Sequence, residues 1–201
     1  MNIQFPGILR IFFKNYIWRK TPSEKVIYLT FDDGPVPEVT PEVLEILDKY
    51  GWKATFFCVG ENVQKNPELY NEILRQGHKT ANHSFNHLKG FKYSTFDYVA
   101  NVKKAADFID SKLFRPPYGR ITRKQARLIR NDYEIIMWDV ITHDYNQNLT
   151  NDEVFKNVKN NLRKGSIVVF HDSIKAKDNV LNVLPRAIEF WKANGYTYGV
   201  L

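Results

Sequence analysis

Cysteine is almost absent from this chain of 201 residues, since Cys58 is the only one. A single thiol cannot form an intrachain disulfide, so a small fold held together by disulfides is excluded. Cys58 lies in the apolar run 54–59, which favours a buried, unreactive thiol over a nucleophile. Internal repeats, low-complexity stretches and linkers are also missing. We therefore expect a single domain, from residue 21 to residue 201.

No apolar run is long enough to span a bilayer. Residues 5–18 are apolar and aromatic, but Arg10, Lys14 and Asn15 interrupt them and no small-residue cleavage site follows, unlike in a standard secretory signal. We treat residues 1–20 as an N-terminal amphipathic segment. It can lie peripherally on a membrane surface or pack against the domain as an extra element. Cytoplasmic, membrane-associated and cell-envelope locations all stay open.

The chain also lacks long runs of Lys or Arg and any nucleic-acid-binding motif. Its net charge is +7, from 29 Lys and Arg against 22 Asp and Glu, and the cations are scattered along the sequence. We therefore expect a solvated basic surface and no nucleic-acid partner. Aromatic residues make up 14% of the chain, which suits either a packed core or a sugar-binding cleft. Nothing in the sequence sets the number of subunits.

Short apolar runs alternate with amphipathic segments along the rest of the chain. We expect strands at residues 26–31, 54–59, 79–82, 113–115, 134–138, 167–170 and 196–200. Thr40 followed by Pro41 opens a helix that ends at Gly51, and Thr150 with Glu153 forms a capping box. The other expected helices cover about 66–77, 95–111 and 122–131, and a last one runs to 194. This alternation predicts an α/β fold of parallel βα units, either a barrel or an open doubly wound sheet.

The unusual polar residues follow the expected strands, where parallel βα folds gather their reacting groups. They are Asp32 and Asp33 after the first strand, His83 and His87 after the third, Arg115 and Tyr118 after the fourth, His143 and Asp144 after the fifth, and His171 and Asp172 after the sixth. Of the five histidines, only His78 is outside this set. Chance placement explains this poorly, so we expect a functional site at this edge of the sheet.

Asp33, His83 and His87 form a metal-ligand pattern. The two histidines are four residues apart, so on a helical turn their imidazoles share one face and can bind one divalent ion, with Asp33 as third ligand. Two histidines and one carboxylate leave coordination positions open, which is typical of a catalytic site and would also suit a non-haem iron(II) oxygenase. The competing interpretations are an ordinary acidic turn at Asp32-Asp33 and two unrelated surface histidines.

Together these residues resemble the polysaccharide deacetylases with a NodB-type domain, which form carbohydrate esterase family 4. Five motifs carry the resemblance in the family's order: Thr-Phe-Asp-Asp-Gly-Pro at 30–35, His-Ser-Phe-Asn-His at 83–87, Arg-Pro-Pro-Tyr at 115–118, Asp144-Tyr145, and Val-Phe-His at 169–171. The match covers roughly residues 25–201. It implies a distorted, often incompletely closed (β/α) barrel with about seven parallel strands.

The resemblance also implies a reaction, the hydrolytic removal of N-acetyl or O-acetyl groups from a glycan such as peptidoglycan or chitin-like N-acetylglucosamine oligomers. It implies a divalent metal on Asp33, His83 and His87; these ligands favour Zn²⁺, although Co²⁺, Ni²⁺ or Mn²⁺ can occupy such a site. The implied roles are general base for Asp32, general acid for His171, partner of that acid for Asp144, orientation of the base for Arg115, and an oxyanion-hole backbone N–H for Tyr118.

The fourth motif departs from the family. Ile141 stands where the family has its first Asp, and Tyr145 replaces a Trp that lines the substrate groove. Asp144 is retained, so catalysis is not obviously lost, but the substrate range is in question. Two alternatives to a glycan deacetylase therefore stay open: a NodB-fold amidase acting on a small non-sugar C–N bond, and a non-catalytic glycan-binding module.

Overall fold

The computed structural model describes residues 15–201, and the main part of the amphipathic segment expected at residues 1–20 lies outside them. The strands are β1 Tyr16–Ile17, β2 Val26–Asp32, β3 Thr55–Cys58, β4 Lys79–Asn82, β5 Leu113–Phe114, β6 Glu134–Ile136, β7 Val140–Ile141, β8 Ile167–His171 and β9 Thr197–Gly199. The α-helices are α1 Thr40–Tyr50, α2 Gly60–Lys65, α3 Pro67–Arg75, α4 Thr95–Ala105, α5 Arg123–Ile129, α6 Asn151–Asn161 and α7 Lys177–Ala193. Short 3-10 turns are η2 Gly90–Lys92, η3 Pro117–Gly119 and η4 Ile174–Ala176.

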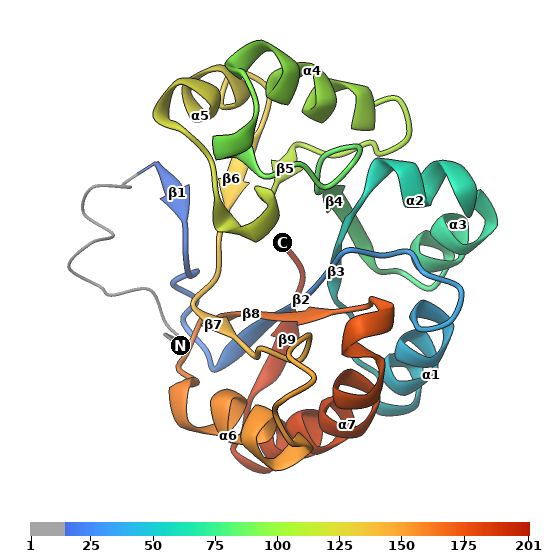
Figure 1. Ribbon diagram of the computed structural model, residues 1–201. Coiled ribbons are helices and arrows are strands. Elements are labelled where there is room, and N and C mark those ends of the chain that lie inside the picture. Colours follow the sequence, from blue (N-terminus) through green and yellow to red (C-terminus); the bar gives the residue numbers. More distant parts are fainter. Residues whose placement is uncertain (1–14) are drawn as a thin grey trace.

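All strand pairings in the sheet are parallel, in the order β1-β6-β5-β4-β3-β2-β8-β7, with β9 added on β2. Within residues 15–201, no pairing joins β7 to β1, so the curled sheet is an incompletely closed barrel with helices around it (Figure 1). The predicted distorted (β/α) barrel is confirmed, and all seven predicted strands are present. Two short strands, β1 and β7, were not predicted.

Local sequence explains most element boundaries. Thr122 and Thr150 each cap a helix through a full capping box, and Gly51 ends α1 with a left-handed φ of 66°. The helix expected at 95–111 ends earlier, at Ala105. Asp107 and Asp110 follow, and carboxylates at a helix carboxyl end are repelled by its macrodipole.

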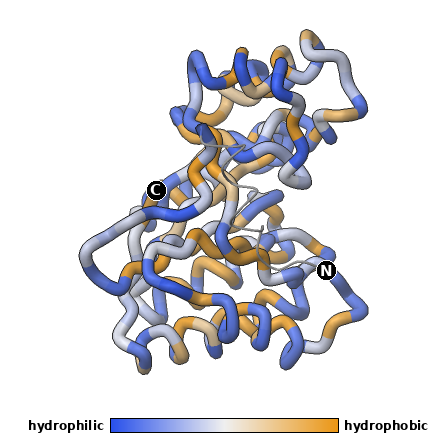
Figure 2. Tube along the Cα trace, turned by 90° about the vertical axis from the view of Figure 1, so that its left-hand side faces the viewer, coloured by the Kyte–Doolittle hydropathy of each residue, from blue (hydrophilic) through white to orange (hydrophobic). Residues whose placement is uncertain are grey.

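Most of the core lies between the helices and the sheet, and a smaller separate cluster is formed by strand residues, namely Phe57, Ala81, Ile136 and Ile167. The main apolar cluster packs α1 and α7 against β2, β3 and β8, and includes Trp52 stacked on Trp191 at 5.2 Å between ring centroids. A second cluster joins α4 and α5 to β5 and β6, and buried Trp18 belongs to it. In the side view of Figure 2, apolar segments concentrate in the strands while the outer helices alternate between hydrophilic and hydrophobic residues. No helix in the described part of the chain has the length and apolar character to cross a membrane.

The strand register brings the polar strand ends together. Asp32 of β2 pairs with His171 of β8, and the last residue of β4, Asn82, pairs with Phe114 just before Arg115. Residues that are far apart in sequence therefore meet at one edge of the sheet. Cys58, the last residue of β3, is fully buried near this edge, and burial together with the charges of Asp172 and Asp32 raises the pKa of its thiol, as expected for an unreactive cysteine.

Candidate active site

The three expected metal ligands converge after β2 and β4. One oxygen of Asp33 and one ring nitrogen each of His83 and His87 lie within 4.8 Å of one another. The φ angles of Asp33 and His87 are positive, at 85° and 54°. Such conformations are unfavourable for residues with a side chain and recur at functional sites, where the surrounding structure maintains them.

Hydrogen bonding sets the tautomer of His83, and a ring nitrogen of each histidine faces Asp33. Nδ1 of His83 donates to the carbonyl oxygen of Arg115 at 2.7 Å, so its Nε2 carries the lone pair, 3.7 Å from Oδ1 of Asp33. Nε2 of His87 is 3.1 Å from the same oxygen. Burial lowers the pKa of His83 to about 4, so the ring is neutral at pH 7. Two imidazole nitrogens and one carboxylate oxygen, with one ring oriented from behind, fit a divalent ion.

Asp33 is ionised in this setting. Burial raises the pKa of its carboxyl, but the hydrogen bond from His87 and the charges of nearby histidines, led by that of His171, outweigh burial and hold the pKa well below its usual range. The carboxylate is therefore available as a metal ligand throughout the neutral range.

Asp32, the last residue of β2, is held in place by Arg115. Nη1 of Arg115 donates to Oδ1 of Asp32 at 2.5 Å and to Oγ1 of Thr30 at 2.9 Å, and Nη2 donates to the carbonyl of Met137 at 3.1 Å. The guanidinium is fully buried and lies over the ring of Phe57. Burial lowers the pKa of Arg115, and the charge of Asp32 opposes that shift. Asp32 is thus a buried carboxylate with a fixed cationic partner, 3.9 Å from Nε2 of His83 through its other oxygen.

His171, at the end of β8, is paired with Asp144. Nδ1 of His171 lies 2.7 Å from Oδ1 of Asp144, and the backbone N–H of His171 donates to Oδ2 at 2.7 Å. Burial lowers the pKa of His171, but the charge and hydrogen bond of Asp144, with smaller contributions from Asp33 and Asp32, raise it to about 9. The imidazole is therefore protonated at neutral pH, and its Nε2–H is the proton left for other partners.

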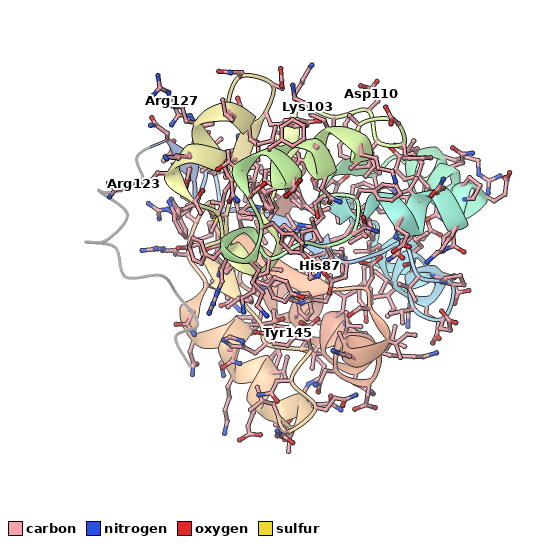
Figure 3. All side chains as sticks on the ribbon, turned by 45° about the horizontal axis from the view of Figure 1, so that its top comes forward. His87, Lys103, Asp110, Arg123, Arg127 and Tyr145 are labelled. Carbon is pink, nitrogen blue, oxygen red and sulfur yellow. The ribbon has the colours of Figure 1, made fainter. Side chains whose placement is uncertain are left out.

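Two tyrosines flank these groups. Tyr118 is 59% exposed in η3, has a φ of 60°, and its ring centroid lies 4.6 Å from that of His87. Tyr145 packs edge-on against His171 at 4.8 Å, and its hydroxyl is 2.9 Å from Nδ1 of His143. Figure 3 views this end of the sheet, with His87 and Tyr145 near its centre. All eight site residues expected from the sequence thus lie at one end of the barrel.

The sequence did not predict the residues that hold the two ligand loops, which follow β2 and β4 and carry Asp33, His83 and His87. Nδ2 of Asn62 donates to the carbonyl of Asp33 at 2.7 Å. Oδ1 of Asn101 accepts from the backbone N–H of Phe85 at 2.9 Å and of Asn86 at 3.1 Å. Both asparagines sit inside helices, and no local pattern marks them as different from other polar helix residues.

Asp172 is a further positioning residue, although its place at a strand end was noted from the sequence. Its carboxyl accepts from the N–H of Gly34 at 3.0 Å and from the hydroxyl of Thr40 at 2.7 Å. A Cβ on Gly34 would lie 1.9 Å from Oδ2 of Asp172, so only glycine fits here. Burial and the charge of Asp33 raise the pKa of Asp172 to about 8, against the opposing effect of the two hydrogen bonds. This contact fixes the turn that follows the Asp32-Asp33 pair.

Comparison with known proteins decides the family. The family model described as polysaccharide deacetylase matches residues 19–135. A peptidoglycan-N-acetylglucosamine deacetylase of Bacillus cereus is 32% identical over 196 residues, which cover 90% of this chain and 88% of that protein. The chain belongs to the polysaccharide deacetylase family. With curated relatives named as deacetylases, the chain is classed as a hydrolase of carbon–nitrogen bonds other than peptide bonds.

Other family members are longer. A peptidoglycan-N-acetylmuramic acid deacetylase of Bacillus subtilis is 32% identical over 173 residues, and the match covers 81% of this chain but 36% of that protein. A second Bacillus cereus deacetylase is matched over 56% of its length. This polysaccharide deacetylase chain therefore spans about half or less of several curated relatives.

Solved structures show the same fold. A peptidoglycan N-acetylglucosamine deacetylase in complex with 4-naphthalen-1-yl-N-oxidanyl-benzamide superposes with a TM-score of 0.85 at 28% identity, over 93% of this chain and 91% of that one. A family-4 pseudoenzyme of Bacillus anthracis superposes with a TM-score of 0.81 at 26% identity, over 92% of this chain and 66% of that one. Since the same fold occurs in an enzyme and in a pseudoenzyme, the residues of the site, and not the fold, decide whether a member is active.

Proposed function

We propose that this chain is a metal-dependent glycan deacetylase that releases acetate from an acetylated amino sugar. One observation carries the proposal: a cluster of two imidazoles and one carboxylate lies beside the buried carboxylate of Asp32, and its Asp33 interacts electrostatically with the protonated imidazole of His171. Hydrolysis of an amide needs those three components, which are a site for an electrophile, a base for water and an acid for the leaving nitrogen.

Asp33, His83 and His87 would hold the divalent ion. Zn²⁺ suits this nitrogen and oxygen set best, and Co²⁺, Ni²⁺ and Mn²⁺ are the alternatives. When bound, such an ion lowers the pKa of a coordinated water from 15.7 toward roughly 7 and polarises a substrate carbonyl.

Asp32 is the proposed general base. Arg115 neutralises its charge and orients it, which leaves the Oδ2 side, toward His83, to accept a proton from the attacking water. The oxygen of that water forms the new bond to the acetyl carbon. Tyr118, whose ring lies against that of His87, would donate its backbone N–H to the carbonyl oxygen as negative charge develops on it.

His171 is the proposed general acid. Since its Nδ1 is bound to Asp144, Nε2–H donates the proton to the leaving nitrogen as the C–N bond breaks. The products are acetate and a free amine, or an alcohol if an O-acetyl group is removed. Asp144 accepts the hydrogen bond from Nδ1 and so supports the imidazolium.

The names of two relatives indicate the class of substrate. They refer to N-acetylglucosamine and N-acetylmuramic acid units of peptidoglycan, so we propose an acetylated glycan of the cell envelope. The exposed ring of Tyr118, beside the proposed metal ligand His87, would provide an aromatic wall for a sugar. Where the family has Trp, Tyr145 presents a smaller ring whose hydroxyl contacts His143, so this part of the groove wall differs from that of the family.

Metal analysis combined with acetate release from N-acetylglucosamine oligomers tests this function. The proposal predicts bound divalent metal and metal-dependent acetate release. Metal without acetate release, but with release of ammonia or an amine from small amides, would indicate the amidase alternative. Neither metal nor turnover, with retained glycan binding, would indicate a non-catalytic module.

A further inference from the structure

Positive charge is concentrated in one part of the molecule. Residues 88–134, which we call the α4–α5 lobe, carry eleven of the 29 Lys and Arg but five of the 22 Asp and Glu. The lobe thus has a net charge of +6 out of +7 for the whole chain. The cations that look scattered along the sequence therefore gather in space, in the part of the molecule drawn at the top of Figure 1.

The same lobe exposes most of the large apolar side chains. Of eight such side chains on the surface of the described residues, five lie here: Phe91, Tyr93, Phe96, Tyr118 and Leu128. Phe96 is 81% exposed and Phe91 61% exposed. Exposed phenyl rings are costly in water, so a group of them marks a contact surface.

Cations and apolar side chains share one surface. The amide of Gln125 in α5 donates to the carbonyls of Gly90 and Tyr93, which holds the η2 segment against α5. A hollow of about 650 Å³ lies between the start of α4 and α5, lined by Thr95, Lys124, Arg127, Leu128 and Asn131.

The basic side chains of residues 120–130, in α5 and at its two ends, are available to a partner. Arg120, Arg123, Lys124, Arg127 and Arg130 are exposed, and none takes part in the ion pairs found among residues 15–201. In Figure 3, Arg123 and Arg127 lie at the periphery of the molecule, away from His87 and Tyr145.

The chain also enters the fold at this lobe. β1 pairs with β6, and Trp18 packs in the apolar cluster under α4 and α5. Burial raises the pKa of Tyr16, while the charges of Arg130 and Arg123 oppose that shift, which places these cations beside β1. Residues 1–23 contain no Asp or Glu, and residues 5–14, outside the described part, have an apolar sequence with Arg10 and Lys14.

We propose that the α4–α5 lobe is a membrane-contact surface that binds bilayers of anionic phospholipid. Aromatic side chains favour the headgroup region of a bilayer, and nearby Lys and Arg are attracted by anionic lipids. A soluble polyanion would need the cations alone, whereas Phe91, Phe96 and Leu128 add apolar groups without a polar end, which fit the hydrocarbon boundary. Arg115 and Tyr118 lie in this lobe but belong to the proposed catalytic groups. Phe91, Phe96, Leu128 and the cations of residues 120–130 do not, and they would hold the enzyme at the membrane.

Vesicle co-sedimentation of the whole chain tests the proposal. Two sets of vesicles are compared, phosphatidylcholine alone and phosphatidylcholine with about one third phosphatidylglycerol, with added salt as a further variable. The test variants are the doubles Phe91→Ser/Phe96→Ser and Arg123→Glu/Arg127→Glu. The matched controls are Leu74→Ser on α3, which is 43% exposed, and Lys49→Glu/Lys156→Glu on α1 and α6.

The proposal predicts binding to the anionic vesicles only, weakened by salt, and reduced at least about tenfold in both test doubles but not in the controls. Acetate release from a soluble oligomer should be the same in all these variants. Three results would overturn the proposal: no binding to anionic vesicles, binding that both test doubles retain, or binding of soluble polyglutamate in place of vesicles. The second result would assign the membrane contact to another segment, and the third would make the lobe a polyanion site.

Discussion

The proposed acid depends on Asp144, so Asp144→Asn is the most informative substitution at the site. The change keeps the shape of the side chain and removes its charge. Oδ1 of Asp144 lies 2.7 Å from Nδ1 of His171, and this contact is the main force opposing the lowering of the pKa by burial. Without the charge, the pKa of His171 should fall from about 9 to its ordinary value of 6.5 or below.

The size of the effect follows from the fraction of protonated imidazole. A general acid must carry its proton, so activity is lost as pH rises through the pKa of the acid. At pH 8.5, roughly three quarters of the His171 side chains are protonated if the pKa is about 9, and roughly 1% if it is about 6.5. Asp144→Asn should therefore lose roughly 80-fold in kcat at pH 8.5 but much less near pH 6.

The assay is the pH dependence of kcat for acetate release from an N-acetylglucosamine oligomer, with saturating metal. The alkaline limb should move down by about two and a half pH units in Asp144→Asn. Tyr145→Phe is the matched control, because it keeps the ring against His171, removes only the hydroxyl contact with His143, and should leave the limb in place. An unmoved limb in Asp144→Asn, or an equal loss at every pH, would refute this role for Asp144.

Three further substitutions test other parts of the site and the core. Arg115→Met should destabilise the fold by about 3–5 kcal/mol because it leaves Asp32 buried without its partner, and an unchanged urea midpoint would contradict this. Gly34→Ala should weaken metal binding in calorimetry by at least about tenfold, since the new Cβ would lie 1.9 Å from Oδ2 of Asp172 and the ligand loop must shift; wild-type affinity would exclude that positioning role. Trp191→Ala removes a fully buried ring and should cost about 3–5 kcal/mol of stability. The metal affinity of the folded Trp191→Ala protein should be unchanged. A loss of metal affinity alongside the loss of stability would show that packing in the core and metal binding at the site are coupled.

Strand-end residues were predictable because parallel βα geometry places every carboxyl strand end at the same edge of the sheet. Asp33, His83 and His87 therefore meet even though about fifty residues of sequence separate the first from the second. The sequence also predicted helix starts well, because Thr122 and Thr150 act through local hydrogen bonds within one turn.

Contacts that depend on packing between distant helices and loops were not predictable. Asn62 and Asn101 reach the ligand loops only because α2 and α4 lie beside them, and no spacing rule encodes this. The short strands β1 and β7 have two residues each, too few for an alternating pattern to stand out. The hydrogen bond from the N–H of Gly34 to Asp172 likewise depends on the register between β2 and β8, which the sequence does not specify.

The central claim is that the two adjacent carboxylates have different tasks, with Asp33 for the metal and Asp32 for the water. The direct test is to measure bound zinc and acetate release in Asp32→Asn and Asp33→Asn, side by side. The account predicts that Asp32→Asn keeps about one equivalent of metal and loses at least about a hundredfold in kcat, whereas Asp33→Asn loses the metal itself. Metal loss in Asp32→Asn with retention in Asp33→Asn, or near-wild-type turnover in Asp32→Asn, would contradict it.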